Sequence, residues 1–125
     1  MNYRKQVIQS SNADILVSIH QNAFSQPKVK GAQVFYYQDS EQAKLLAGCI
    51  QNSIKAYADS ENMRKIKSSK DYYILKISQM PGVIVECGFL TNPEEEAKLA
   101  SDKYQDQIAW AIYVGIIDYF GQLEK

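Results

Sequence analysis

Short β-branched runs alternate along the chain with longer stretches of helical apolar spacing. Residues 83–85 are continuously apolar, which is typical of a strand buried on both faces of a parallel or mixed sheet. Mostly apolar or aromatic runs predict further strands at residues 15–20, 31–38 and 72–77. Apolar residues three and four positions apart predict amphipathic helices over residues 39–57 and 105–120.

The order of these elements predicts an α/β fold. We expect a three-layer sandwich in which helices cover both faces of a mixed, mostly parallel sheet. The chain has 125 residues, a single-domain length, so residues 1–125 should form one domain. Asp39 is the expected N-cap of the first long helix. Asn92 and Pro93 are expected to begin a further helix, with Glu95 completing a capping box.

Two polar side chains close the apolar strands. Glu86 follows the run at 83–85, and His20, the single histidine of the chain, ends the strand at 15–20. Ligands of open α/β sheets collect at the carboxyl ends of strands, so neighbouring strands would bring an imidazole and a carboxylate together. The alternatives are a Glu86 that simply reaches solvent and a structural His20.

The amino-acid composition bears on which partners the protein could bind and on whether it could span a membrane. Fourteen basic residues balance fourteen acidic ones, so nothing points to nucleic acid or an anionic membrane. Cys49 and Cys87 lack the spacing of a disulfide scaffold or zinc knuckle and are expected to be buried thiols. No apolar run approaches the roughly 20 residues of a membrane span, and no signal-peptide hydrophobic region begins the sequence.

Two further segments allow both a functional and a structural interpretation. The aromatic residues at 35–37 are suited to stacking on sugars, but aromatic side chains dominate cores and packing under a helix is the simpler interpretation. The polar connection at 59–71 carries Arg64, Lys65, Lys67 and Lys70. It is either a solvated loop or a basic rim for an anionic substrate. The apolar arc of the last helix is broad, so we expect that helix to be well buried, in part against another chain.

The two strand ends carry a family resemblance. Residues 18–22, Ser-Ile-His-Gln-Asn, and residues 80–93, which include Val-Ile-Val-Glu-Cys-Gly-Phe-Leu-Thr-Asn-Pro, resemble two signatures of the zinc-dependent N-acetylmuramoyl-L-alanine amidases, the amidase_3 family. His20 and Glu86 lie 66 residues apart, in the family's order. Segments 31–37, 71–75 and 108–116 are similar to germination-specific cortex amidases of spore-forming bacteria.

The resemblance implies hydrolysis of the amide between N-acetylmuramic acid and L-alanine in peptidoglycan, at an extracytoplasmic cell wall or spore cortex. His20 matches a histidine ligand of the family's Zn²⁺, Glu86 matches the catalytic glutamate, and Asn22 matches a substrate-binding position. Zinc lowers the pKa of bound water toward about 7, and a glutamate then accepts the water's proton.

The sequence departs from the family pattern at its beginning. It contains no Asp-Pro-Gly-His-Gly-Gly segment and no following helix with the family's glutamate ligand, so two expected zinc ligands have no counterpart. A catalytic zinc needs about three protein ligands. We therefore expect a truncated amidase_3 domain with weak zinc binding and little activity by itself. The missing strand would leave a sheet edge that favours self-association.

Two other functions remain open at this stage. The chain is alternatively a non-catalytic fragment that binds peptidoglycan or a partner protein. A further alternative is a hydrolase that uses Cys87 and His20, although successive strand residues point to opposite faces and Cys87 would then face away from Glu86.

Overall fold

The computed structural model describes residues 2–125. Its helices and strands follow one another as α1 (Asn2–Ser10), β1 (Leu16–Asn22), β2 (Gln33–Tyr37), α2 (Glu41–Tyr57), β3 (Lys67–Ser69), α3 (Tyr73–Ile77), β4 (Gly82–Phe89), α4 (Pro93–Leu99) and α5 (Asp102–Leu123). None of the helices within residues 2–125 is long and apolar enough to cross a membrane.

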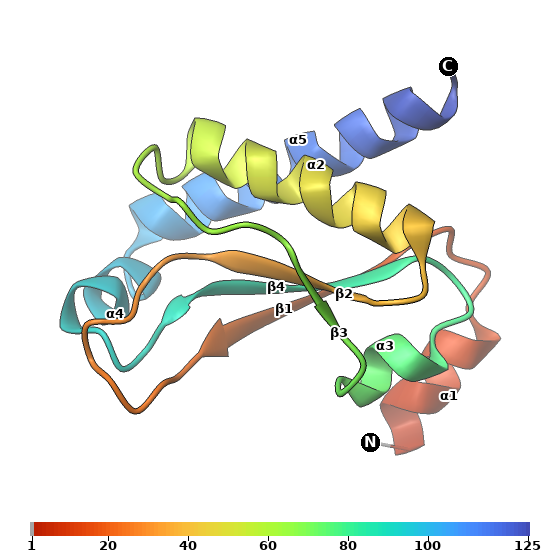
Figure 1. Ribbon diagram of the computed structural model, residues 1–125, viewed down its shortest axis with the longest axis horizontal. Coiled ribbons are helices and arrows are strands. Elements are labelled where there is room, and N and C mark those ends of the chain that lie inside the picture. Colours follow the sequence, from red (N-terminus) through yellow and green to blue (C-terminus); the bar gives the residue numbers. More distant parts are fainter. Residues whose placement is uncertain (1) are drawn as a thin grey trace.

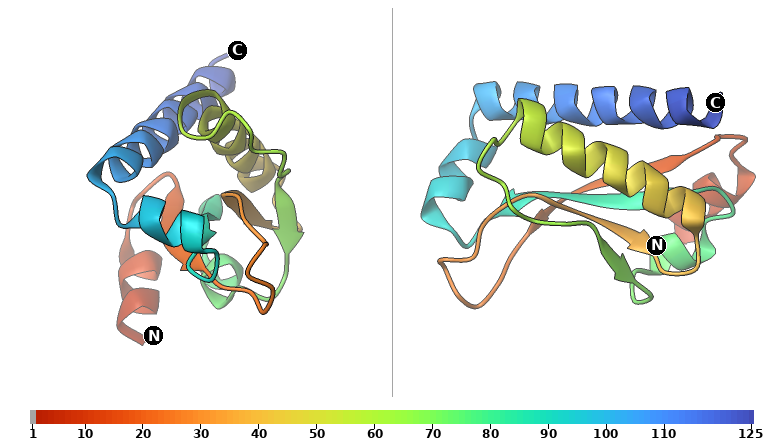
Figure 2. Two further views of the ribbon diagram at one scale, coloured as in Figure 1. Left: turned by 90° about the vertical axis from the view of Figure 1, so that its left-hand side faces the viewer. Right: turned by 45° about the horizontal axis from the view of Figure 1, so that its top comes forward.

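The four strands form one mixed sheet in the order β1-β4-β2-β3. β1 runs parallel to β4, β2 runs antiparallel to β4, and β3 runs parallel to β2. Helices α2 and α5 lie on one face of the sheet, and α1 and α3 lie on the other (Figures 1 and 2). The predicted three-layer α/β architecture with a mixed, mostly parallel sheet is therefore confirmed.

The main core lies between the sheet and the pair α2 and α5. Val34, Val83 and Val85 point to this side and are fully buried, as the unbroken apolar run of β4 predicts. Helix α5 is buried along one stripe only. Trp110 is 55% exposed and Ile117 is 52% exposed, so this chain alone does not bury the broad apolar arc of α5, and its burial against another chain stays a prediction.

The strand predicted at residues 72–77 is wrong, because residues Tyr73–Ile77 form helix α3. Ile74 and Leu75 are neighbours in the sequence and both are buried. In a strand with one exposed face they would point to opposite faces, and one of them would be exposed. The carbonyl oxygen of Tyr72 accepts hydrogen bonds from the N–H groups of Leu75 and Lys76 and so closes the first turn. The aromatic and β-branched residues of this segment mimic a strand, but they cover the second face of the sheet.

The fourth strand instead comes from the polar connection. β3 spans only Lys67–Ser69 and pairs with β2 through its backbone. It has no apolar run that a sequence pattern could detect, because its side chains are mostly exposed. Such a short, charged strand is typical of a sheet edge.

The helix starts follow the expected chemistry with two corrections. Ser40, and not Asp39, is the N-cap of α2, and its side chain accepts a hydrogen bond from the N–H of Ala43. Asn92 caps α4 as predicted, with Pro93 in the first turn. Glu95 does not complete a capping box, because its buried carboxylate accepts hydrogen bonds from the N–H groups of Gly31 and Phe89.

The opposite edge of the sheet is formed by β1. Within residues 2–125 this strand pairs only with β4, and Ile19 is 63% exposed. A groove of about 520 Å³ follows the strand between α1 and Ile74. An unpaired apolar edge is a template for another strand, so self-association through β1 stays a prediction.

Candidate functional site

The structure brings His20 and Glu86 together. They are directly paired residues of the parallel strands β1 and β4, so both side chains leave the sheet on the same face at the carboxyl ends of these strands. This is the face covered by α1 and α3 and not by the main core (Figure 1). The expectation that two strands deliver an imidazole and a carboxylate to one place is confirmed.

Glu86 is held in an unusual environment for a carboxylate. Only 5% of its surface is exposed, and its Oε2 atom has no hydrogen-bond partner among residues 2–125. Burial raises the pKa of the Glu86 carboxyl, while the nearby His20 and hydrogen bonding with the Tyr72 side chain lower it in part. The alternative of a glutamate that reaches solvent at the strand end is wrong.

This raised pKa predicts a dependence of stability on pH. Because the folded-state pKa lies above the ordinary value of 4.5, the contribution of Glu86 to stability is present below that pH and is lost as the pH rises through the folded-state pKa. Glu86→Gln removes the buried charge, so it should stabilise the fold at pH 7 by about 1 kcal/mol. Thermal unfolding at pH 4 and pH 7 measures the difference. An exposed control, Glu96→Gln, should change stability little at either pH.

His20 is half-buried beside Ser18 of the same strand. The Ser18 Oγ and His20 Nε2 atoms are 2.7 Å apart, within hydrogen-bonding distance. This contact fixes the orientation of the ring, as second partners of functional histidines commonly do. Sequence reasoning did not single out Ser18, although the two-residue strand period places it on the same face as His20.

Asn22 lies at the end of β1, after an irregularity in the pairing with β4. Its Oδ1 accepts a hydrogen bond from the N–H of Ala23, and its carbonyl oxygen accepts one from the N–H of Leu90. The side-chain oxygen therefore shapes the turn that leaves the strand. The role of Asn22 in binding substrate stays a prediction.

Tyr72 is a member of the site that sequence reasoning missed. Burial raises the pKa of its phenol, and the charge of Glu86 and hydrogen bonding with Glu86 raise it further. Its ring packs against Phe35, with ring centroids 5.5 Å apart. Phe35 thus supports the site, whereas Tyr36 packs against the main core. The interpretation of these aromatic residues as packing is the one the structure favours.

Cys87 lies on the other face, as the strand period predicts. It is buried in the main core, and burial together with the charge of Glu86 raises the pKa of the Cys87 thiol to about 11. A thiol with that pKa is almost fully protonated at neutral pH and is a poor nucleophile. Both observations argue against a hydrolase that uses Cys87 and His20.

The described residues do not complete a zinc centre. His20 and Glu86 offer one imidazole and one carboxylate, and nowhere in residues 2–125 do three or more His, Cys, Asp or Glu side chains gather in a way that could hold a metal ion. A catalytic zinc site needs about three protein ligands. His20 and Glu86 could therefore supply part of a zinc site, but not all of its ligands.

Comparisons with known proteins agree with this geometry. Residues 1–118 match the model of a family described as N-acetylmuramoyl-L-alanine amidase. The chain is 38% identical over 117 residues to the germination-specific N-acetylmuramoyl-L-alanine amidase of Bacillus subtilis, covering 94% of this chain and 49% of that protein. The chain therefore spans about half the length of this relative, and it spans 54% of a second Bacillus subtilis protein that it matches.

Solved structures show the same fold. The CwlD amidase of Clostridioides difficile, solved in complex with the GerS lipoprotein, superposes with a TM-score of 0.94 at 47% identity, covering 96% of this chain and 61% of that one. The amidase AmiC2 of Nostoc punctiforme superposes with a TM-score of 0.87 at 34% identity, covering 97% and 66%. The sheet of residues 2–125 is therefore a substantial part of a known α/β fold.

Proposed function

Because the chain belongs to the N-acetylmuramoyl-L-alanine amidase family, we propose that it forms part of a peptidoglycan hydrolase. This hydrolase cleaves the amide between N-acetylmuramic acid and L-alanine at the cell wall or spore cortex, outside the cytoplasm. The observation that carries the proposal is the paired placement of His20 and the buried Glu86 at the ends of two parallel strands. Similarity to a germination-specific amidase supports a role in spore germination.

We propose that Glu86 is the general base. A base works best when its pKa lies near the operating pH, and burial raises the Glu86 pKa in that direction. The free Oε2 atom is available to accept a proton from the attacking water. Glu86 then donates that proton to the alanine nitrogen as the amide bond breaks. The Tyr72 side chain lies near the carboxylate and lowers its pKa in part.

We propose that His20 is one ligand of the Zn²⁺ that the family is expected to use. A neutral imidazole suits zinc, but the remaining ligands would have to come from outside residues 2–125, since no group of three is present there. For that reason we assign no reaction step to the metal, and we expect little amidase activity from this chain by itself.

This view predicts the outcome of a zinc titration. Calorimetry on the purified chain should show no site of micromolar or tighter affinity, because one imidazole and one carboxylate hold zinc weakly. Micromolar binding that disappears in His20→Ala would show instead that further ligands are supplied, for example by a second copy of the chain. Hydrolysis of peptidoglycan by the chain that a chelator abolishes would contradict the same prediction.

The catalytic proposal is tested in a chimera. This chain replaces the matching segment of a longer relative, which the superposition on the C. difficile amidase, with a TM-score of 0.94, makes structurally reasonable. The chimera should clear a suspension of peptidoglycan. A folded chimera that binds peptidoglycan without cleaving it would support the second candidate, a non-catalytic binding module, which the incomplete set of metal ligands favours.

A further inference from the structure

Three neighbouring strands place polar side chains in one row. His20 of β1 pairs with Glu86 of β4, and Glu86 pairs with Gln33 of β2. Directly opposite residues point to the same face and have Cβ atoms about 5 Å apart. Gln33 is therefore the immediate neighbour of the proposed base, on the side away from His20.

Gln33 connects this row to the basic segment between α2 and β3. Its Oε1 accepts a hydrogen bond of 3.2 Å from Nη1 of Arg64, and its Nε2 donates one of 2.8 Å to the carbonyl oxygen of Lys65. Both polar atoms of the amide are used in this way. Gln33 thus fixes Arg64 one side chain away from Glu86.

Arg64 is held in a defined position by further contacts. Its Nε donates a hydrogen bond of 2.8 Å to the carbonyl oxygen of Lys30, and its guanidinium carbon lies 5.0 Å from the centre of the Phe89 ring. Its backbone N–H donates to Oδ1 of the buried Asn62. These contacts keep the guanidinium from moving freely, which lowers the entropic cost of binding a ligand.

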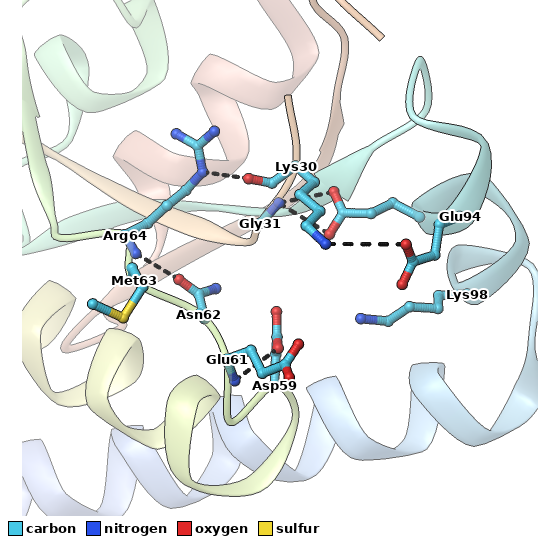
Figure 3. A pocket seen from close by; sticks show the side chains of 10 residues that line it. Lys30, Gly31, Asp59, Glu61, Asn62, Met63, Arg64, Glu94 and Lys98 are labelled. Atoms are coloured by element: carbon cyan, nitrogen blue, oxygen red, sulfur yellow. Dashed lines mark hydrogen bonds and ion pairs between the residues drawn. The ribbon is translucent and has the colours of Figure 1, made fainter. Parts of the chain in front are cut away.

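Gly31 provides the room for this arrangement. Gly31 has a φ of +108°, and a Cβ atom at this position would lie 3.0 Å from Nε of Arg64. Figure 3 shows the terminal nitrogens of Arg64 pointing away from the mixed-charge pocket in which Lys30 pairs with Glu94. The guanidinium is consequently directed away from that pocket and not into it.

Arg64 forms no ion pair with a carboxylate of the described residues. Across residues 2–125 the structure contains one ion pair, between Lys30 and Glu94, so no carboxylate lies within 4.0 Å of the Arg64 guanidinium. The bonds to Lys30 and Gln33 use two of the five N–H donors of an arginine. The remaining donors form a partly exposed fork that matches a carboxylate in shape and charge.

We propose that Arg64 binds a carboxylate on the peptide side of the substrate. The inference rests on the proposed function, because the scissile amide joins the lactyl group of an uncharged sugar to alanine, and the peptide residues that follow the alanine carry the free carboxylates. With the amide nitrogen at Glu86, Arg64 selects a peptide that bears a negative charge beyond the alanine. Gln33 is a positioning residue, since it acts through Arg64.

The test compares two small ligands that differ only in charge. The probes are N-acetylmuramoyl-L-alanyl-glutamate and its diamide, titrated by calorimetry or by NMR into the chain. The wild-type chain should bind the acid about 10- to 100-fold more tightly than the diamide, as expected for a charge-assisted pair. Arg64→Gln should reduce this preference to less than about 3-fold. Arg64→Lys should give an intermediate preference, because an ammonium is a point charge without the fork.

Lys65→Gln is the matched control. It removes the same charge from the next residue, whose side chain is exposed, and should keep the wild-type preference. Equal binding of acid and diamide by the wild-type chain, or equal loss of preference in Arg64→Gln and Lys65→Gln, would overturn this inference while leaving the proposed function intact. No binding of either ligand by the wild-type chain would also overturn this inference, whereas the proposed function is tested separately by the bond that the chimera cleaves. If Arg64→Gln fails to fold, the inference is tested with Arg64→Lys alone. An unchanged preference for the acid in Arg64→Lys would then overturn the inference that the guanidinium binds the carboxylate through two N–H donors.

Discussion

Replacing Glu86 by glutamine should lower the rate of amide hydrolysis in the chimera by about 10² to 10⁴-fold. Glutamine has nearly the same shape as glutamate but cannot accept a proton, so the water and the leaving nitrogen lose their proton carrier. Binding of peptidoglycan should change little, because Glu86 is buried and paired across the sheet with His20 and Gln33. The expected loss is therefore in kcat and not in KM.

Loss of folding does not explain such a result, since the same substitution is expected to stabilise the protein at pH 7. Glu96→Gln in the chimera is the matched control, because Glu96 is exposed on α4 and should leave the rate unchanged. A Glu86→Gln chimera that is folded and retains more than about a tenth of the wild-type rate is incompatible with a general base at this position.

Gly115→Ala should destabilise the fold by about 2 kcal/mol or more. Gly115 lies where α5 crosses α2, and a Cβ atom there would be 2.7 Å from Cα of Ile50 and 2.9 Å from its Cγ1. No rotamer change moves a Cα atom away, so the two helices must separate, and Ile50 is fully buried in the main core. Equilibrium urea unfolding measures the change in the free energy of unfolding.

Gly48→Ala is the control for this prediction. Gly48 also lies inside a helix, α2, but a Cβ atom there meets nothing within 4 Å. The same substitution should therefore stabilise the fold by up to about 1 kcal/mol through helix propensity. Destabilisation of similar size at both positions would contradict the close approach of α2 and α5 at Gly115.

The sequence was sufficient to place His20 and Glu86 because each stands at the end of a mostly apolar run that forms a strand, although only the strand that holds Glu86 is buried throughout. Their pairing needed one assumption, that the two strands are neighbours, and the register of β1 and β4 confirms it. The N-cap at Asn92 was equally predictable, since the cap, the proline and the first turn are consecutive in the chain. At these positions the local sequence pattern and the packing of the folded chain favour the same structure.

The sequence was not sufficient to predict segments whose structure depends on packing against distant parts of the chain. Tyr72 and Ile74 have strong strand propensity, yet the segment forms a short helix because it must cover the face of the sheet that α2 and α5 leave open. β3 is stabilised by backbone pairing with β2 and carries no pattern of its own. Arg64 appeared only as one charge in a polar connection, and its placement by Gln33, Lys30 and Phe89 depends on contacts between distant parts of the chain.

The most direct test of the amidase proposal is the identity of the bond that the chimera cleaves. Peptidoglycan digested by the chimera is analysed by mass spectrometry for peptides with a free amino-terminal alanine and for intact glycan chains. We predict stoichiometric release of such peptides, without new reducing sugar ends, and almost none from the Glu86→Gln chimera. Cleavage within the glycan or between other peptide residues, or equal release by both chimeras, would contradict the assignment of Glu86 and of the amidase reaction to this chain.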